Sequence, residues 1–184
     1  MQRPDKRKDS FTKREVKEFD EEVIQIDRVT RVVKGGRKMR FRATVAIGNR
    51  KGKVGIGVGK SNEVTGAIQK AISKAKKEMI KITMDGATIP HEVKLKYKSA
   101  RLLIMPAGPG TGLIAGASIR KVLELSGIKD ILSKCFGTKN KVNNSKAIFE
   151  ALKTLKANPK MMWKAREESK KAAKEQSAKS SSEQ

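Results

Sequence analysis

The chain has 184 residues and a formal net charge of +24, from 43 Lys and Arg against 19 Asp and Glu. This charge predicts an anionic partner, and the phosphates of a nucleic acid are the partner that so basic a composition favours. No apolar run approaches the roughly 20 residues that span a bilayer, which argues against a membrane partner. With one cysteine and one histidine, the chain lacks the residues for a zinc site or for nucleophilic catalysis, so we expect no metal, no cofactor, no small-molecule substrate and no enzyme activity.

Both ends of the chain are expected to be flexible. The arm, residues 1–21, has mixed charges and no sustained apolar periodicity, although Phe11, Val16 and Phe19 suffice for one helical turn against the body. The arm also lacks the apolar core of a secretory signal, so we expect the protein to stay in the compartment where it is made. The tail, residues 157–184, is a basic, polar segment of low complexity.

A Gly-Gly turn between β-branched segments predicts a β-hairpin over residues 23–48. In its second strand, apolar residues such as Phe41 and Val45 alternate with polar residues such as Arg40 and Thr44. Successive side chains of a strand point to opposite faces. We therefore expect one face of this strand to pack and the other to be positively charged.

A third strand follows, in which Val and Ile alternate with Gly55, Gly57 and Gly59. A strand face of bare backbone marks either the approach of a ligand or the close packing of the next helix, and the residues leave both interpretations open. Apolar residues at helical spacing from Val64 onward predict that helix. The first unit, residues 22–84, is therefore expected to be a three-stranded antiparallel sheet with one helix on its apolar face.

The second predicted unit covers residues 92–156, after a linker at residues 85–91 that Asp-Gly and Pro mark. It opens with an alternating segment that ends in the apolar run LLIM. The loop PAGPGTG then predicts a helix that includes Leu113 and Ile114 and closes at Gly127. A short strand in IKDILSKCFG and a last helix in KVNNSKAIFEALKTLK complete the unit.

Two glycine motifs resemble nucleotide-binding loops, and we reject both. GIGVGKS leaves three residues between its first Gly and its Gly-Lys pair, whereas a phosphate-binding loop needs four. GTGLIA, from Gly110, has Asp130 downstream, but Asp130 lies at the start of the next apolar run rather than at its carboxyl end, where a ribose-binding acid belongs. The favoured interpretation of the second motif is a turn that enters a helix or an anion-binding helix N-terminus.

Basic residues concentrate in the predicted hairpin and third strand. Residues 23–60 contain eleven Lys and Arg against one acid, Asp27. Solubility alone favours mixed charge, so this segment predicts phosphate contacts at the hairpin and at the turn of residues 49–53. The RNA-contacting residues expected are Arg28, Arg31, Lys34, Gly35, Gly36, Arg37, Lys38, Arg40, Arg50, Lys51, Lys53 and Lys60.

Aromatic residues are few, with five Phe, one Trp and one Tyr. None is interleaved with Lys and Arg on a single predicted sheet face, as a platform for base stacking requires. We therefore expect shape and backbone contacts to dominate over the reading of unpaired bases.

Three long blocks carry a family resemblance: RVTRVVKGGRKMRFRATVAIGN, GKVGIGVGKSNEVTGAIQKAISKAKKEM and PAGPGTGLIAG. Over residues 22–156 the chain closely resembles the bacterial-type ribosomal protein S-five family. The resemblance implies an α+β fold, in which a β-β-β-α unit similar to double-stranded-RNA-binding domains precedes a two-layer β-α-β-α domain with a left-handed crossover. It also implies a structural constituent of the small ribosomal subunit, which binds ribosomal RNA beside the S-four and S-eight proteins, near the entry path of messenger RNA.

By position, the loop from Thr30 to Arg37 resembles the RNA-contacting hairpin of the family, whose alteration is associated with spectinomycin resistance. The loop from Pro106 to Gly112 resembles a segment near the S-four contact, on which decoding accuracy depends. Many bacterial members have Ser-Glu where this chain has Gly108-Pro109, so the chain departs from the family pattern at that contact. The protein-contacting residues implied are Pro106, Gly108, Gly110, Thr111 and Gly112.

One alternative from another class is a free-standing regulator or strand-separating factor that binds double-stranded RNA. It would use the same basic face without a fixed place in the ribosome, and the second domain argues against it. A ribosomal protein would reside in the cytoplasm, and the sequence leaves an organelle stroma or matrix open as well.

Overall fold

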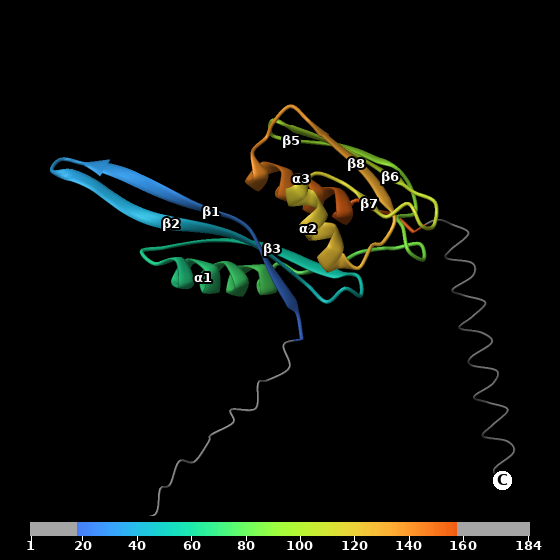
Figure 1. Cartoon of the computed structure of the whole chain (residues 1–184), viewed down its shortest axis with the longest axis horizontal. Coiled ribbons are helices and arrows are strands. Elements are labelled where there is room, and N and C mark those ends of the chain that lie inside the picture. The colour runs from blue at the N-terminus through green and yellow to red at the C-terminus, as the bar shows by residue number, and fades with distance from the viewer. Residues whose placement is uncertain (1–17, 158–184) are drawn as a thin grey trace, which may run out of the picture.

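The computed structural model describes residues 18–157 (Figure 1). All but the first residue of the predicted flexible tail and all but the last residues of the predicted arm lie outside this range, together with the helical turn proposed at Phe11 and Val16. Within the described part of the chain, every helix falls short of the length and apolarity needed to cross a bilayer.

The first half of the chain forms an antiparallel sheet in the order β1-β2-β3-β4, with one helix. The predicted hairpin is confirmed: β1 and β2 pair from Asp20↔Gly48 to Val33↔Gly36. The prediction of three strands is incomplete, because a short fourth strand pairs with the start of β3 through Val54↔Ile80. The elements are β1 Asp20–Val33, β2 Gly36–Gly48, β3 Lys53–Ser61, α1 Val64–Lys77 and β4 Ile80–Lys81.

The glycines of β3 allow α1 to pack directly on the sheet. A Cβ atom added at Gly57 would lie 2.0 Å from the carbonyl oxygen of Ala71, and one at Gly59 would lie 2.3 Å from that of Ala67. The facing alanines of α1 are fully buried. Close packing of the helix therefore accounts for the glycine face that the sequence left open between two interpretations.

The second half forms a mixed sheet in the order β5-β6-β8-β7, antiparallel except for the pair β7 and β8. The α+β class is confirmed, and α2, which closes at Gly127 with a φ of 88°, is the crossover between the parallel strands. The elements are β5 Val93–Tyr97, β6 Ala100–Pro106, β7 Leu113–Ile114, α2 Ala117–Ser126, β8 Ile131–Phe136 and α3 Lys141–Lys153.

Two sequence predictions for this half are wrong. The alternating segment that ends in LLIM was expected to form one strand, but it forms two, β5 and β6. The chain reverses between Tyr97 and Ala100, and the two strands pair with each other. Leu113 and Ile114 belong to β7 rather than to the helix. The buried Asp130 carboxylate accepts a hydrogen bond of 2.8 Å from the amide of Gly112, which aligns the next two residues with β8.

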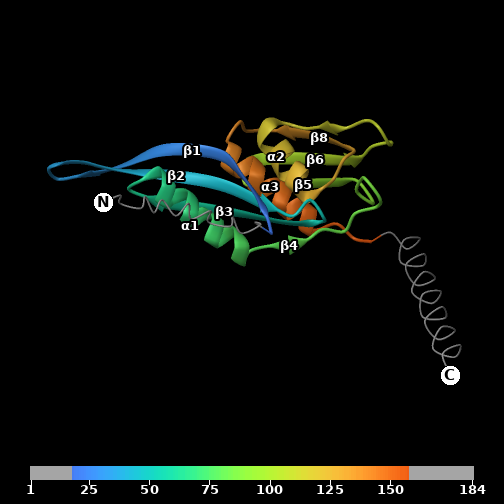
Figure 2. The same cartoon turned by 60° about the horizontal axis from the view of Figure 1, so that its bottom comes forward.

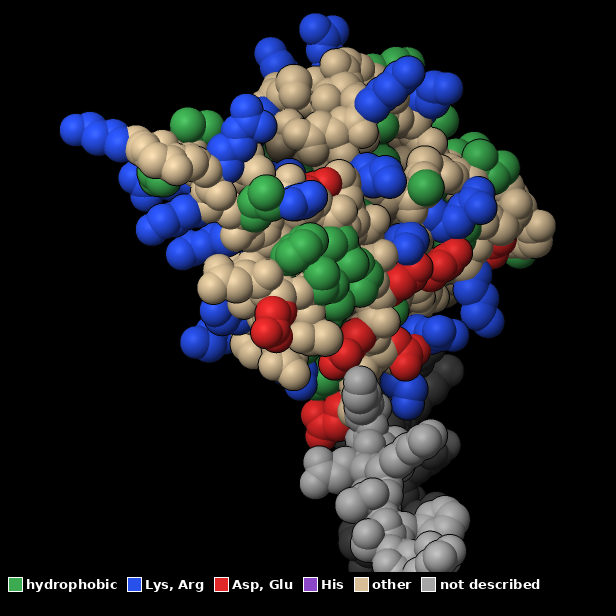
Figure 3. Space-filling model, turned by 60° about the vertical axis from the view of Figure 1, so that its left-hand side comes forward, with side chains coloured by type: hydrophobic (Ala, Val, Ile, Leu, Met, Phe, Trp, Pro, Cys, Tyr) green, Lys and Arg blue, Asp and Glu red, His purple; other side chains and the backbone are tan. Residues whose placement is uncertain are grey.

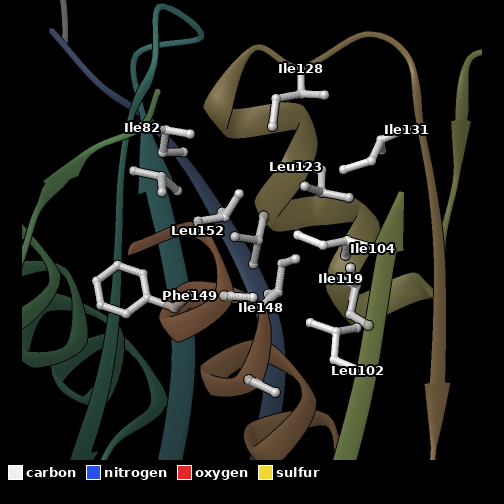
Figure 4. Packing of buried hydrophobic residues seen from close by; sticks show 14 of the residues in the cluster. Ile82, Leu102, Ile104, Ile119, Leu123, Ile128, Ile131, Ile148, Phe149 and Leu152 are labelled. Atoms are coloured by element: carbon white, nitrogen blue, oxygen red, sulfur yellow. The ribbon is translucent and has the colours of Figure 1, made fainter. Parts of the chain in front are cut away.

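The two halves share one hydrophobic core, because α2 and α3 lie between the two sheets (Figures 1 and 4). Ile104 and Ile131 from the second sheet, Leu123 and Leu152 from the helices, and Val54 from the first sheet belong to the same buried cluster. The first sheet is thus covered by α1 on one face and by α2 and α3 on the other.

This arrangement corrects the prediction of a uniformly charged second face on β2. Thr44 and Ala46, which lie on that face, are 0% exposed beneath the second half of the molecule. At the same seam, the Lys121 ammonium of α2 donates to the carbonyl oxygen of Val23 at 2.8 Å and forms an ion pair with Glu22 at 3.0 Å. Only the other half of β2, toward the hairpin turn, remains in solvent.

Candidate nucleic-acid interface

The end of the hairpin extends as a two-stranded ribbon beyond the rest of the molecule (Figures 1 and 2). β3 ends at Ser61, opposite Phe41, so the residues of β2 before Phe41 pair with β1 alone. Neither α1 nor the second half of the chain covers this part, and every residue from 30 to 40 is exposed. We call residues 29–40 the hairpin arm.

One face of the hairpin arm carries a groove lined by cations. Arg31 pairs across the strands with Lys38, and Lys60 of β3 pairs with Arg42, so these side chains share a face. A cavity of about 360 Å³ is lined there by Arg31, Lys38, Arg40 and Lys60 with Val29 and Thr30. None of the described residues that line it is acidic. We call these four cations the basic groove.

Asp27 lies at the base of the basic groove and is held by Arg42. The guanidinium donates to one oxygen of the Asp27 carboxylate from Nε at 3.0 Å and from Nη2 at 2.6 Å. These hydrogen bonds from Arg42 lower the pKa of Asp27, against the opposing effect of partial burial. Asp27 therefore neutralises Arg42, and among the described residues the four groove cations form no ion pair of their own.

Lys34, Gly35, Gly36 and Arg37 form the exposed tip of the hairpin arm. A Cβ atom added at either glycine would meet nothing within 4 Å. Gly36 has a φ of +154°, which side chains of L-residues rarely adopt, so the turn requires glycine there for its backbone conformation. In the space-filling view from the hairpin side, Lys and Arg side chains predominate and acidic side chains gather low on the face (Figure 3).

The structure does not bring the second predicted basic turn to the hairpin tip. Residues 49–52 lie at the opposite end of β2, about 40 Å away at the usual rise of a strand. Arg50 donates its amide to the carbonyl oxygen of Leu125 at 3.0 Å and forms an ion pair with Asp20 at 2.8 Å. This turn is docked on the end of α2, although Lys51 and Lys53 are exposed.

The twelve predicted RNA-contacting residues therefore separate into four places. Four form the basic groove and four form the tip. Arg28 lies on the opposite face of the hairpin, where its side chain contacts the sulfur atom of Met39. Arg50, Lys51 and Lys53 occupy the distant turn.

A second cationic surface was missed from the sequence. Arg120, Lys134, Lys139 and Lys141 line a cavity of about 530 Å³ at the starts of α2 and α3. Both helices begin there because each follows one of the parallel strands β7 and β8, which run in the same direction. The basic residues near the two helix starts are visible in the sequence. Because Leu113 and Ile114 were assigned to the helix, strand β7 was not predicted, and the sequence therefore offered no reason to place the two helix starts side by side.

The five predicted protein-contacting residues lie together, with Pro106 at the end of β6 and the other four in the loop between β6 and β7. The hydroxyl and the amide of Thr111 both donate to the carbonyl oxygen of Gly108, at 2.8 and 3.2 Å. Gly110 and Gly112 have φ values of 87° and 76°. Asp130, the acid of the rejected nucleotide motif, holds the amide of Gly112. These hydrogen bonds hold the backbone of the loop, in which residues 108–111 are exposed and Gly112 is half-buried.

The comparisons with known proteins agree on one family. The family model described as ribosomal protein S5, N-terminal domain, matches residues 19–83, and the model of the C-terminal domain matches residues 95–166. The small ribosomal subunit protein uS5 of Campylobacter jejuni is 51% identical over 139 residues, which cover 76% of this chain and 95% of that protein. The chain belongs to the ribosomal protein S5 family.

Proposed function

We propose that the chain is a structural constituent of the small ribosomal subunit and binds its RNA through the basic groove and the tip of the hairpin arm. The single observation that carries this proposal is a projecting ribbon with four cations around one groove, whose described lining residues include no acid. Membership of the family supports the same function. The protein supplies contacts and no chemical step, so we propose no enzyme activity.

The basic groove suits the RNA backbone because phosphate contacts need charge and reach rather than sequence-specific donors. Arg31 and Arg40 each carry a planar guanidinium that can hold a phosphate through two hydrogen bonds, while Lys38 and Lys60 act as point charges. The exposed glycines at the tip leave the turn backbone open to close approach. The ribbon would thus lie along a phosphate backbone and make contacts on the groove face.

The proposal also includes contacts with neighbouring ribosomal proteins and with messenger RNA. We place the S-four contact at the loop from Pro106 to Gly112, whose exposed residues and fixed backbone suit a protein surface. An S-eight contact, a position near the messenger entry path and a role in decoding accuracy follow from the family resemblance alone. The proposed location is the ribosome, in the cytoplasm or in an organelle.

The test compares two variants of the full chain in which the same amount of charge is removed. In the groove variant, Arg31, Lys38, Arg40 and Lys60 are all replaced by Ala. In the control variant, four exposed lysines of α1 are replaced instead, namely Lys70, Lys74, Lys76 and Lys77. Binding to small-subunit ribosomal RNA is measured over a series of salt concentrations.

The groove variant is expected to bind the RNA more weakly and to show a smaller salt dependence, with the slope reduced by about one unit for each phosphate that the protein no longer neutralises. The control should keep most of the affinity, because α1 lies away from the groove. Equal weakening of the two variants would show that only net charge matters and would refute the assignment to the groove. Recovery of the protein from native lysate in a free light fraction, crosslinked to scattered RNA duplexes, would favour the regulator instead.

A further inference from the structure

The second sheet has one face that no described element covers. α2 and α3 cover its inner face, where Leu102, Ile104 and Ile131 are buried. The alternate residues of β5, β6 and β8 point to the outer face. The register places them in rows across the strands: Lys96, Arg101 and Phe136 in one row, and Lys94, Leu103 and Lys134 in the next.

Phe136 is the exposed aromatic residue of this face. It is 50% exposed at the end of β8 and lies directly opposite Arg101 of β6. Leu103 and Lys134 form the adjoining cross-strand pair. A cavity of about 370 Å³ is lined here by Phe136, Leu103, Lys94, Lys96 and Arg101, with contributions from Leu95 and Leu102.

The charge around this cavity has one sign. The part of its lining that the structure describes contains three cations and no carboxylate, and Lys134 adds a fourth cation in the row beside that of Phe136. Among the described ion pairs, that between Lys94 and Glu92, at 3.5 Å and on largely exposed side chains, is the one that involves this group. Exposed pairs of that kind are weak, so the face remains strongly positive.

This geometry corrects the expectation that no aromatic residue is interleaved with Lys and Arg on one sheet face. Phe136 and Arg101 are far apart in the sequence, and the antiparallel pairing of β6 with β8 makes them neighbours. Within β8, Lys134 and Phe136 are two residues apart and share this face, which the spacing along the strand does show, whereas the neighbouring Arg101 comes only from the pairing of strands.

We propose that this face is a stacking platform for an unpaired RNA nucleotide. A nucleobase would stack on the Phe136 ring against Leu103, and the phosphates on either side of it would contact Arg101 and the flanking lysines. Single-stranded RNA offers a π face and a negative charge at each nucleotide, which matches a ring set among cations. The proposal shares its ligand class, RNA, with the proposed function but rests on none of the same residues.

The test uses the full chain and a short single-stranded uridine RNA with one central 2-aminopurine, whose fluorescence is quenched when the base stacks. Phe136→Leu keeps an apolar side chain but removes the ring, and Phe136→Tyr keeps the ring. Ile114→Ala is the matched control, because Ile114 is a 52% exposed apolar residue of the same sheet that does not line the cavity. A short RNA duplex serves as the second ligand.

We expect Phe136→Leu to weaken binding of the single strand by about fivefold or more and to abolish the quenching that binding causes. Phe136→Tyr and Ile114→Ala should both behave like the unaltered chain. Duplex binding should be unchanged by Phe136→Leu and weakened by the groove variant, so failure of one site can be told from failure of the other.

Unaltered affinity and quenching in Phe136→Leu would overturn the proposal, and the face would then be better explained as a protein contact. Equal weakening by Ile114→Ala would overturn it too, because the effect would not depend on the ring. Loss of binding in Phe136→Tyr would have the same consequence.

Discussion

The two halves of β2 lie in opposite environments although they belong to one continuous strand. From Gly36 to Arg40 both faces are exposed, and from Ala43 to Gly48 every residue is buried. Polar and apolar residues alternate from Lys38 to Thr44, across the border between the two halves. The exposed half contributes to the basic groove, and the buried half is the centre of the molecule.

The difference shows that alternation predicts a strand but not what covers its faces. α1 and the second half of the chain both end short of the hairpin arm, and their extent divides β2 (Figure 2). Where both layers are present, residues on each face must be small or apolar. Where neither is present, cations remain available for a ligand. Substitutions at buried and exposed positions of β2 should therefore differ sharply in their effect on stability.

Gly48→Ala should destabilise the protein by disturbing the packing of the buried half of β2. A Cβ atom at this position would lie 2.2 Å from the carbonyl oxygen of Leu125, a backbone atom of α2 that cannot rotate away. We expect the free energy of unfolding to fall by about 3 kcal/mol, at the upper end for overpacked positions. Urea denaturation of the full chain measures this change.

Gly35→Ala is the control from the exposed end of the hairpin. A Cβ atom there meets nothing within 4 Å, so the substitution should change the unfolding free energy by less than about 0.5 kcal/mol. Similar decreases in the two variants would contradict the division of β2 into buried and exposed halves.

Thr44→Val should stabilise the protein. The Thr44 hydroxyl oxygen is buried at the seam between the two halves and has no hydrogen-bond partner among the described residues. Val has nearly the same shape and removes this unsatisfied group, so we expect a gain of about 1 kcal/mol in the free energy of unfolding. A loss of stability on chemical denaturation would mean that the hydroxyl is satisfied and that the seam is less tightly closed.

The Asp27 and Arg42 pair should contribute a small, pH-dependent stabilisation at the border between the two halves of β2. Because Arg42 lowers the pKa of Asp27 in the folded state, the stabilisation is present above the unfolded value, near pH 4, and is lost as pH falls through the folded pKa. We expect about 0.5 kcal/mol, since the two side chains are 20% and 33% exposed.

Thermal unfolding of the unaltered chain and of Asp27→Asn over a pH series measures this contribution. The two should differ at neutral pH and converge in acid. Glu92→Gln, which breaks the more exposed pair with Lys94, is the control and should have little effect at any pH. A constant difference between Asp27→Asn and the unaltered chain at all pH values would contradict the ionic origin of the effect.

The local elements could be predicted from the sequence, because each depends on neighbouring residues. The Gly-Gly turn between β-branched segments predicted the hairpin, apolar spacing predicted α1, and Gly127 predicted the end of α2. The long family blocks determined the α+β class. Charge concentration in residues 23–60 also identified the cations that form the basic groove.

Which of these elements contact one another could not be predicted from the sequence and is seen in the folded chain. The second layer over Thr44, the separation of the turn at Arg50 from the hairpin tip, and the pairing of Phe136 with Arg101 all depend on contacts between residues distant in the chain. Such contacts depend on how the sheets and helices stack, and periodicity within one segment carries no information about the partner of its faces. The residues of the proposed sites were therefore visible in the sequence, whereas their grouping was not.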